Sequence, residues 1–151
     1  MLEIGQRAPD FTLPDQDGKP VTLGELLRER AVVLFFYPKD ETPICTAESC
    51  AFRDAYADLL ELGASVIGVS GDGAESHRRF RENHRLPYPL LSDAGGKVAA
   101  QYGVSALFGL MAGRATFVID RSGVVRHVTA ARFRAEVHVA EARTALQRLG
   151  S

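Results

Sequence analysis

The chain has two cysteines, Cys45 and Cys50, in the segment TPICTAESC that begins at Thr42. The thiolate is the reactive form of cysteine, and a free thiol with a pKa of about 8.5 is only slightly ionised at pH 7. Thr42-Pro43 is a helix-start signal, because a hydroxyl residue suits the cap and proline suits the first helical position. Cys45 would then lie in the first turn, where unpaired N–H groups and the helix dipole favour a thiolate. The sequence therefore predicts a nucleophile at Cys45.

The spacing of Cys45 and Cys50 restricts how a bond between them could form. Two cysteines alone do not make a structural disulfide framework. Five residues along a helix correspond to about 7.5 Å of rise and roughly 140° of rotation, so the two side chains would point apart. A disulfide needs α-carbons within about 7 Å of each other. If both residues are helical when reduced, we expect the first turns of the helix to unwind before Cys45 and Cys50 join.

The elements around this segment are predicted from the pattern of apolar residues. An unbroken apolar run over 31–37 predicts a strand buried on both faces, and Pro38 ends it because proline cannot donate to a sheet ladder. The helix from Pro43 would end near Gly63 and lead into a second buried strand, Ala64–Ser70. Two such strands around a helix predict a parallel βαβ unit, and sites in these sheets gather beyond the carboxyl ends of the strands. Cys45 falls at that edge.

The other segments predict further strands and helices in alternation. The pieces Ala8–Pro14 and Pro20–Leu23 surround an Asp17-Gly18 turn and predict a hairpin at an edge. The alternation favours an α/β fold with a mixed sheet covered by helices on both faces, in one domain over residues 1–151. The remaining predictions are a short helix or turn over 23–30, a polar helix over 74–84, a short strand at 90–91, a helix from the Asp93 cap to Tyr102, a mobile loop over 103–113, a hairpin of 115–120 with 124–128, and a final helix with Val139, Ala142, Leu146 and Leu149 on one face.

Composition and charge exclude several classes of protein. The chain has 151 residues, of which 46% are hydrophobic and 25% charged, as expected for one globular domain with a sizeable core. Its net charge of −1 provides no field that would gather nucleic acid or an anionic membrane. The apolar runs are strand-sized, and the N-terminus MLEIGQRAPDF lacks the features of a signal peptide. We therefore expect a soluble, cytoplasmic protein.

The histidines and arginines do not form an obvious site. The four histidines, His77, His84, His127 and His138, show no ligand spacing with the cysteines, so we expect no zinc site. The basic run that starts at His77 is interspersed with acidic residues, which is typical of a solvated helix face. Its other members are Arg78, Arg79, Arg81 and Arg85.

The segment before Cys45 also carries a family motif. Pro38, Thr42 and Cys45 spell P-x-x-x-T-x-x-C, which resembles the active-site motif of the peroxiredoxins. With Cys50 five residues later, the chain is most similar to the bacterioferritin-comigratory-protein or Q-type subfamily. The similarity runs over nearly the whole chain. Further matches are the segments APDF from Ala8 and PYPLLSD from Pro87, and Arg114 at the start of the strand TFVID.

This resemblance implies a thioredoxin-like fold and a thiol peroxidase that reduces hydrogen peroxide and organic hydroperoxides without metal, flavin or another cofactor. Cys45 would be the peroxidatic cysteine, whose thiolate attacks the peroxide and becomes a sulfenic acid. Cys50 would be the resolving cysteine, which forms an intramolecular disulfide that thioredoxin or a similar dithiol reduces. Pro38, Thr42 and Arg114 would complete the catalytic and substrate-binding pocket.

The residue types agree with these implied roles. Displacement at an O–O bond needs an aligned thiolate and donors for the charge on the leaving oxygen. Arg114 can supply a fixed positive charge and several N–H donors. Glu48, one turn beyond Cys45, could hold Arg114 or another arginine in place.

Two other functions remain open from the sequence. A thiol–disulfide oxidoreductase of the same fold would be expected to carry C-x-x-C, whereas Cys45 and Cys50 form C-x₄-C. A redox sensor or chaperone-like protein could use the cysteine pair as a switch without turnover. We expect a monomer, because an intramolecular pair needs no partner subunit, with a dimer through 105–113 or the edge hairpin as the alternative.

Overall fold

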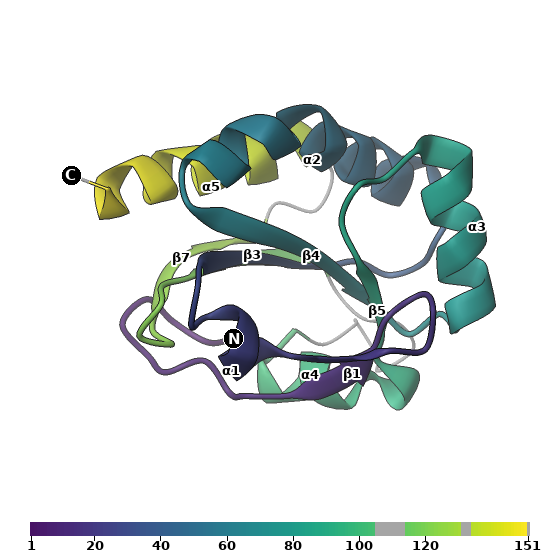
Figure 1. The fold of residues 1–151 in the computed structure, drawn as a ribbon, viewed down its shortest axis with the longest axis horizontal. Helices are drawn as coiled ribbons and strands as arrows, with labels where there is room; N and C mark the ends of the chain where they lie inside the picture. The colour runs from purple at the N-terminus through teal and green to yellow at the C-terminus, as the bar shows by residue number, and fades with distance from the viewer. Residues whose placement is uncertain (105–113, 131–133, 151) are drawn as a thin grey trace.

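The computed structural model describes residues 1–104, 114–130 and 134–150. Its main sheet has the strand order β5-β4-β3-β6-β7 (Figure 1). The strands β3, β4 and β5 are parallel, whereas β6 runs antiparallel to both β3 and β7. The strands are β3 Ala31–Phe36, β4 Ala64–Ser70, β5 Leu90–Ser92, β6 Ala115–Ile119 and β7 Val125–Thr129, and a separate hairpin pairs β1 Thr12–Pro14 with β2 Pro20–Thr22.

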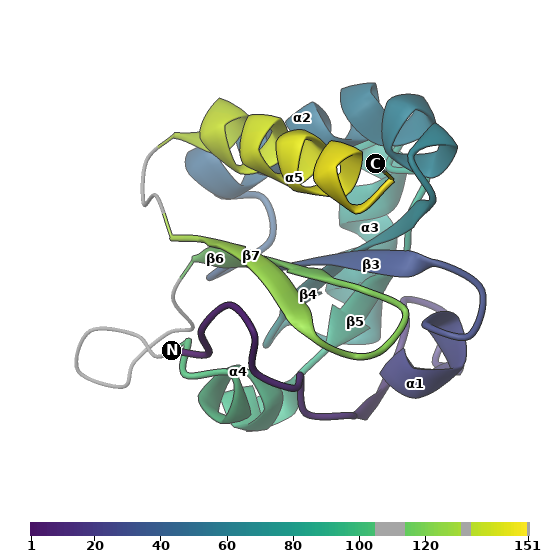
Figure 2. The same cartoon turned by 90° about the vertical axis from the view of Figure 1, so that its left-hand side faces the viewer.

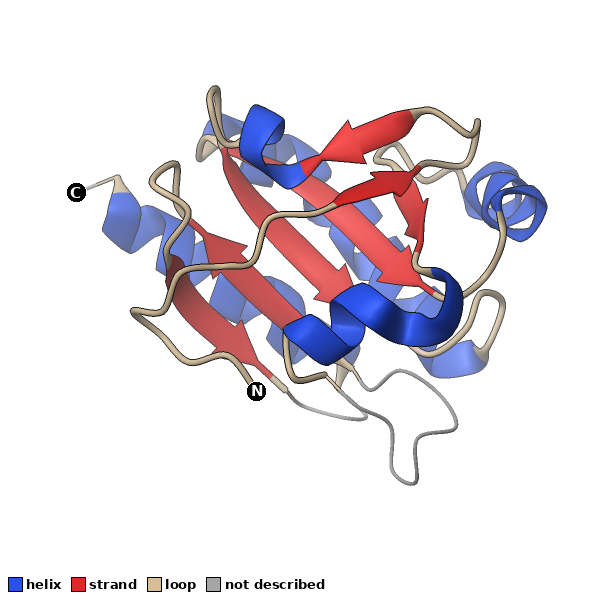
Figure 3. Ribbon diagram, turned by 90° about the horizontal axis from the view of Figure 1, so that it is seen from below, coloured by secondary structure: helices blue, strands red, loops and turns tan. Residues whose placement is uncertain are grey.

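Helices cover both faces of the sheet. The long helices α2 (Pro43–Glu61) and α5 (Ala135–Leu149) lie side by side on one face, and α3 (Ala74–His84) stands at the end of the same layer (Figures 1 and 2). The N-terminal hairpin and two short helices, α1 (Leu23–Leu26) and α4 (Lys97–Gln101), cross the other face (Figure 3). A single turn of 3₁₀ helix, η1 (Ala94–Gly96), leads into α4. This arrangement is the predicted mixed α/β sheet with a hairpin beside it.

Strand β3 divides two hydrophobic cores. Every one of its residues is buried. Val32 packs in the core between the sheet and the helices α1 and α4, and Val33 packs in the core between the sheet and the helices α2 and α5. Burial on both faces explains why the sequence of this strand is an uninterrupted apolar run. On the α2 side, the ring of Phe35 stacks on that of Phe52 with centroids 4.7 Å apart, which fixes α2 over the end of β3.

The central elements match the sequence-based predictions closely. β3 and β4 are parallel neighbours joined by α2, which starts at Pro43 as predicted, and Gly63 has the positive φ of 87° expected just beyond a helix end. The hairpin of β6 and β7 is also confirmed. Of the loop predicted over 103–113, residues 105–113 lie outside the described part of the chain.

Two predictions about helices were wrong in detail. The helix expected from Asp93 to Tyr102 is interrupted, because Gly95 and Gly96 both have positive φ. The carboxylate of Asp93 instead accepts hydrogen bonds from the N–H groups of residues 98 and 99 in α4. Leu149 is exposed, because α5 extends past the sheet at its end.

The predicted solvated face of α3 is also wrong for one residue. His77 is fully buried, although its neighbours Arg78 and Arg79 are exposed. Its ring points inward because its two nitrogens face Asp40 and the carbonyl of Leu91. No helix of the described residues is long and apolar enough to cross a membrane.

Candidate active site

Cys45 is the third residue of α2 and lies at the carboxyl edge of β3. Its side chain is buried, with 1% of the residue exposed, and neither cysteine is in a disulfide. Thr42 occupies the cap position in extended conformation, but its hydroxyl makes no cap hydrogen bond. The hydroxyl instead donates to the carbonyl of Lys39 at 2.9 Å. The predicted position of Thr42 is therefore confirmed, whereas a side-chain cap is not formed.

Arg114 reaches the sulfur of Cys45 from the neighbouring strand. Its Nη2 donates to Cys45 Sγ at 3.1 Å, and its Nη1 donates to Glu48 Oε1 at 2.8 Å. The antiparallel pairing of β6 with β3 places Ala115 opposite Phe36, so the residue before β6 lies at the edge where β3 ends. Arg114 therefore places a positive charge and an N–H donor directly at the sulfur. The expected proximity of Glu48 and Arg114 is confirmed.

Glu48 connects this arginine to a histidine that the sequence did not reveal. Its carboxyl group is completely buried, and His138 Nδ1 lies 3.3 Å from its Oε2. Burial raises the pKa of Glu48 from 4.5 to about 7, because desolvation disfavours the carboxylate more than the positive charge of Arg114 favours it. His138 Nδ1 also lies 2.7 Å from Thr116 Oγ1. The signal for His138 was its place among apolar residues on the buried face of the last helix.

The other predicted site residues include Pro38 and Cys50, which are both less buried than Cys45. Pro38 is half-buried in the loop between β3 and α2. Cys50 is half-buried, which leaves its sulfur more accessible than that of Cys45. It lies beside Tyr88, whose hydroxyl donates to the carbonyl of Ser49 at 2.7 Å. The structure therefore brings Cys45 and Arg114 into contact and keeps Cys50 apart, on the same helix.

A second polar cluster lies under the loop that precedes α2. Ligand atoms of Asp40, Asp72 and His77 all lie within 4.8 Å of one another, a spacing that could suit a metal ion. These atoms are already engaged, since Asp40 Oδ2 lies 2.7 Å from His77 Nδ1 and Asp72 Oδ2 accepts from the N–H of Asp40 at 2.8 Å. We therefore interpret this cluster as a hydrogen-bonded network within the protein.

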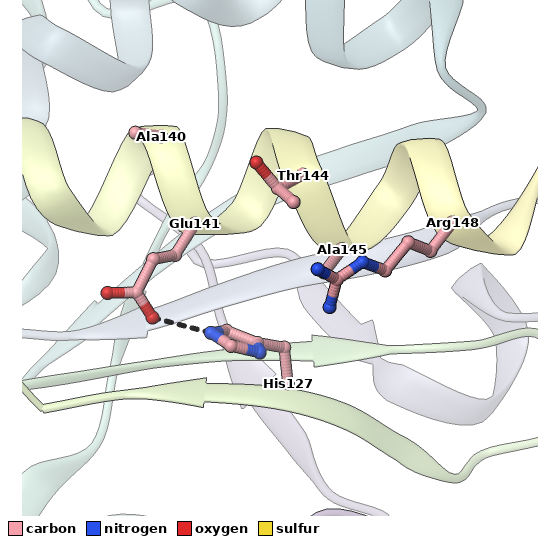
Figure 4. Close-up of a pocket in the computed structure, with 6 residues that line it drawn as sticks. All are labelled: His127, Ala140, Glu141, Thr144, Ala145 and Arg148. Atoms are coloured by element: carbon pink, nitrogen blue, oxygen red, sulfur yellow. Dashed lines mark hydrogen bonds and ion pairs between the residues drawn. The ribbon is translucent and has the colours of Figure 1, made fainter.

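A separate hollow of about 310 Å³ lies between α5 and β7 (Figure 4). In it Glu141 reaches toward His127, with Oε1 and Nε2 2.5 Å apart. None of its lining residues belongs to the group around Cys45. They are His127, Ala140, Glu141, Thr144, Ala145 and Arg148.

Comparisons with known proteins agree with this geometry. The model of the AhpC/TSA family matches residues 4–128. The chain is 49% identical over 146 residues to chloroplastic peroxiredoxin Q of rice, Oryza sativa subsp. japonica, covering 96% of this chain and 67% of the rice protein. It is 51% identical to chloroplastic peroxiredoxin Q of Suaeda salsa, again over 96% of this chain and over 68% of that protein.

A solved structure extends the likeness to the whole fold. The crystal structure of peroxidoxin BcpB from Mycobacterium tuberculosis superimposes with a TM-score of 0.94 and 43% sequence identity, and each chain is covered completely. The thioredoxin-like fold of peroxiredoxins is thus confirmed. Because a family model matches most of the chain and the likeness to peroxiredoxins Q covers 96% of it, the chain belongs to the AhpC/TSA family as a thiol peroxidase of the peroxiredoxin Q type.

Proposed function

We propose that this protein reduces hydrogen peroxide and organic hydroperoxides with Cys45 as the peroxidatic and Cys50 as the resolving cysteine, and that thioredoxin supplies the electrons. The observation that carries the assignment of Cys45 is the 3.1 Å hydrogen bond from Arg114 Nη2 to its buried sulfur. Arg53 lies close enough to Cys50 to interact with it electrostatically, but its hydrogen bonds go to Asp54 and to the carbonyl of His84.

The first step is attack by the Cys45 thiolate on the terminal oxygen of the peroxide. An S–O bond forms and the O–O bond breaks, and the leaving oxygen takes up a proton to give water or an alcohol. Arg114 can donate to the oxygens while charge develops on them. The hydroxyl of Thr42 donates to the carbonyl of Lys39, so its oxygen lone pairs can accept the peroxide O–H. Pro38 limits the access of bulk water.

The second step joins the two cysteines. Cys50 attacks the sulfur of the sulfenic acid, a disulfide forms, and the oxygen leaves as water. Both residues lie in α2 when reduced. Because residues five apart in a helix point their side chains in different directions, the start of α2 must unwind before the disulfide can form. Thioredoxin then reduces the disulfide by thiol–disulfide exchange.

The test is a coupled assay with thioredoxin, thioredoxin reductase and NADPH, using hydrogen peroxide and a bulky organic hydroperoxide. We expect sustained NADPH oxidation that Cys45→Ser abolishes, while Cys50→Ser reacts with one equivalent of peroxide and does not recycle efficiently. Consumption of a single equivalent by the wild type would favour the redox sensor instead. Disulfide exchange on a model protein without peroxide turnover would favour the oxidoreductase.

Two further measurements address movement and assembly. Amide exchange across residues 43–52 should be faster in the oxidised than in the reduced protein, and equal protection would contradict the unwinding step. Light scattering should give the mass of one chain, because both cysteines of the pair belong to the same helix.

A further inference from the structure

The loop between β3 and α2 carries both Pro38 and Thr42, and its middle residue, Asp40, is held from several sides. The carboxyl group of Asp40 is buried. Its Oδ1 accepts from the hydroxyl of Tyr37 at 2.5 Å, and its Oδ2 accepts from Ser76 Oγ at 2.9 Å. The loop is therefore attached both to the end of β3 and to the first turn of α3.

His77 completes this attachment. Its Nε2 lies 3.0 Å from the carbonyl oxygen of Leu91, which can only accept, so Nε2 carries a proton. Its Nδ1 lies 2.7 Å from Asp40 Oδ2, an oxygen that already accepts from Ser76. Both ring nitrogens of His77 therefore have a partner, one in β5 and one in the loop. His77 thereby links the loop to β5 across the interior.

The backbone of Asp40 is fixed as well. Its N–H donates to Asp72 Oδ2 at 2.8 Å, and the hydroxyl of Ser70 donates to the same oxygen at 2.6 Å. Ser70 is the last residue of β4. The carboxyl ends of β3, β4 and β5 thus all contribute to holding one residue of the loop.

The next residue, Glu41, has a backbone conformation that is unfavourable for a residue with a side chain. It has a φ of 63°, in the left-handed region that residues other than glycine rarely adopt. Its carboxylate accepts from Asn83 Nδ2 at 2.8 Å and lies 2.6 Å from His84 Nε2. Such a conformation persists only where surrounding contacts determine it. Both ends of α3 therefore hold the loop.

We propose that His77 is a positioning residue for peroxide reduction. Acting through Asp40, it holds the loop that places Pro38 and Thr42 at the Cys45 sulfur, and it keeps this end fixed while the start of α2 unwinds and re-forms. Asp40 is two residues from both Pro38 and Thr42, so a loss of its attachment shifts both. A displacement of about 1 Å in a pocket of this kind can cost up to about 100-fold in rate. This inference rests on the proposed peroxidase function.

The test uses two substitutions that each keep one donor of the imidazole. His77→Asn places its amide near the position of Nδ1, within reach of Asp40, whereas His77→Gln places it near Nε2, within reach of Leu91. Both are made in a Cys50→Ser background, so that Cys45 is the single thiol. Two rates are measured on the reduced proteins: the second-order reaction with hydrogen peroxide by stopped flow, and alkylation of Cys45 by iodoacetamide, which needs access to the same sulfur but no alignment of an O–O bond.

We expect His77→Gln to slow the peroxide reaction about 10- to 100-fold, and His77→Asn to restore most of the rate, with alkylation unchanged in both. Arg79→Gln, on the exposed face of the same helix, is the control and should match the parent. Ser76→Ala, which removes a weaker contact to Asp40, should slow the peroxide reaction a few-fold and serves if His77→Gln does not fold.

Three results would overturn the proposal. One is that His77→Gln reacts with peroxide as fast as the parent, or that Ser76→Ala does so if His77→Gln does not fold. Another is a slower peroxide reaction accompanied by faster alkylation, because general loosening exposes the buried sulfur and would make the role merely structural. The third is a parent protein that does not react with peroxide, which overturns the proposed function together with this inference. An active parent with unaffected variants overturns this inference alone.

Discussion

Two buried carboxyl–histidine pairs lie on either side of Cys45, and they differ in how completely they are hydrogen-bonded. In the pair Asp40–His77, both carboxyl oxygens accept hydrogen bonds. In the pair Glu48–His138, Oε1 accepts from Arg114, but Oε2 makes no hydrogen bond of good geometry within the described residues. Both pairs are inaccessible to solvent.

The difference in hydrogen bonding gives the two pairs different roles. A fully bonded buried network is rigid, and removing one member leaves the others without partners. An incompletely bonded carboxyl group in the same surroundings changes its protonation instead, and burial indeed raises the pKa of Glu48 to about 7. The Asp40 pair thus fixes the loop before α2, while the Glu48 pair keeps a group that titrates near neutral pH next to Arg114.

The largest expected effect is on stability, from the fully bonded pair. Asp40→Ala should lower the free energy of unfolding by about 3–5 kcal/mol, because it leaves the buried polar groups of Tyr37, Ser76 and His77 without their partner. Urea denaturation followed by circular dichroism measures this change. Glu48→Gln at pH 8 should cost less than about 1 kcal/mol, since a neutral amide can still accept from Arg114. Equal losses for the two variants would remove the distinction between the pairs.

The next largest effect is on the rate of peroxide reduction, and it comes from Arg114, which donates to Glu48. Arg114→Ala should reduce the second-order rate constant for hydrogen peroxide by about 100- to 1000-fold, because a donor to the developing charge is lost. Arg114→Lys should fall in between, since it keeps the charge but not the forked geometry that reaches both Cys45 and Glu48. Arg126→Ala at the exposed Asp120 turn is the control. An unchanged rate in Arg114→Ala would contradict its proposed role.

The third effect is a pH dependence of stability that comes from Glu48. A carboxyl group whose pKa is raised in the folded state stabilises the fold fully below its unfolded value of 4.5, and this contribution is lost as the pH rises through about 7. One pKa unit corresponds to about 1.4 kcal/mol, so between pH 5 and pH 8 the wild type should lose about 2–3 kcal/mol more than Glu48→Gln. Urea denaturation at both pH values measures this difference.

The groups that face Glu48 define the control for that experiment. They are Arg114 and His138, with the buried hydroxyl of Tyr88 also sensing its charge. His138 is present in both proteins, so the comparison isolates the carboxyl group at position 48. Parallel pH profiles for the two proteins would show that Glu48 titrates normally.

The smallest effect concerns the hydrogen bond behind His138. Thr116→Val keeps the shape of the side chain but removes the 2.7 Å contact with Nδ1. The free energy of unfolding should fall by about 1 kcal/mol. If the unfolding free energy of this variant fell as much as that of Asp40→Ala, the histidine near Glu48 would be part of a network as rigid as the other.

The sequence predicted the parts of the site that local pattern determines. The apolar run of β3, the helix start at Pro43 and the position of Cys45 follow from neighbouring residues, and all three were confirmed. Arg114 and Glu48 were expected near the sulfur because a motif and a one-turn spacing pointed to them. Their contact could not be derived from spacing alone, since it depends on how β6 pairs with β3.

The two histidines show where such prediction stops. His77 directly precedes the charged Arg78 and Arg79 in sequence, yet it is buried because Asp40 and Leu91, from distant elements, both bind its ring. His138 was considered only as a zinc ligand, and its partners Glu48 and Thr116 come from α2 and β6. The helical period can indicate that such a polar residue is buried, as for His138, but it does not identify the residues that bind it. The single domain, the cytoplasmic location and the monomeric state stay predictions.

The antiparallel pairing of β6 with β3 also determines when the cysteine can become reactive. Arg114 is 69 residues from Cys45 along the chain, so during synthesis both cysteines emerge long before the strand that delivers the arginine. Contacts between such distant segments form late in folding, because closing the long loop costs entropy first. A nascent chain therefore carries two ordinary thiols, and heightened reactivity toward peroxide arrives only once the sheet is complete.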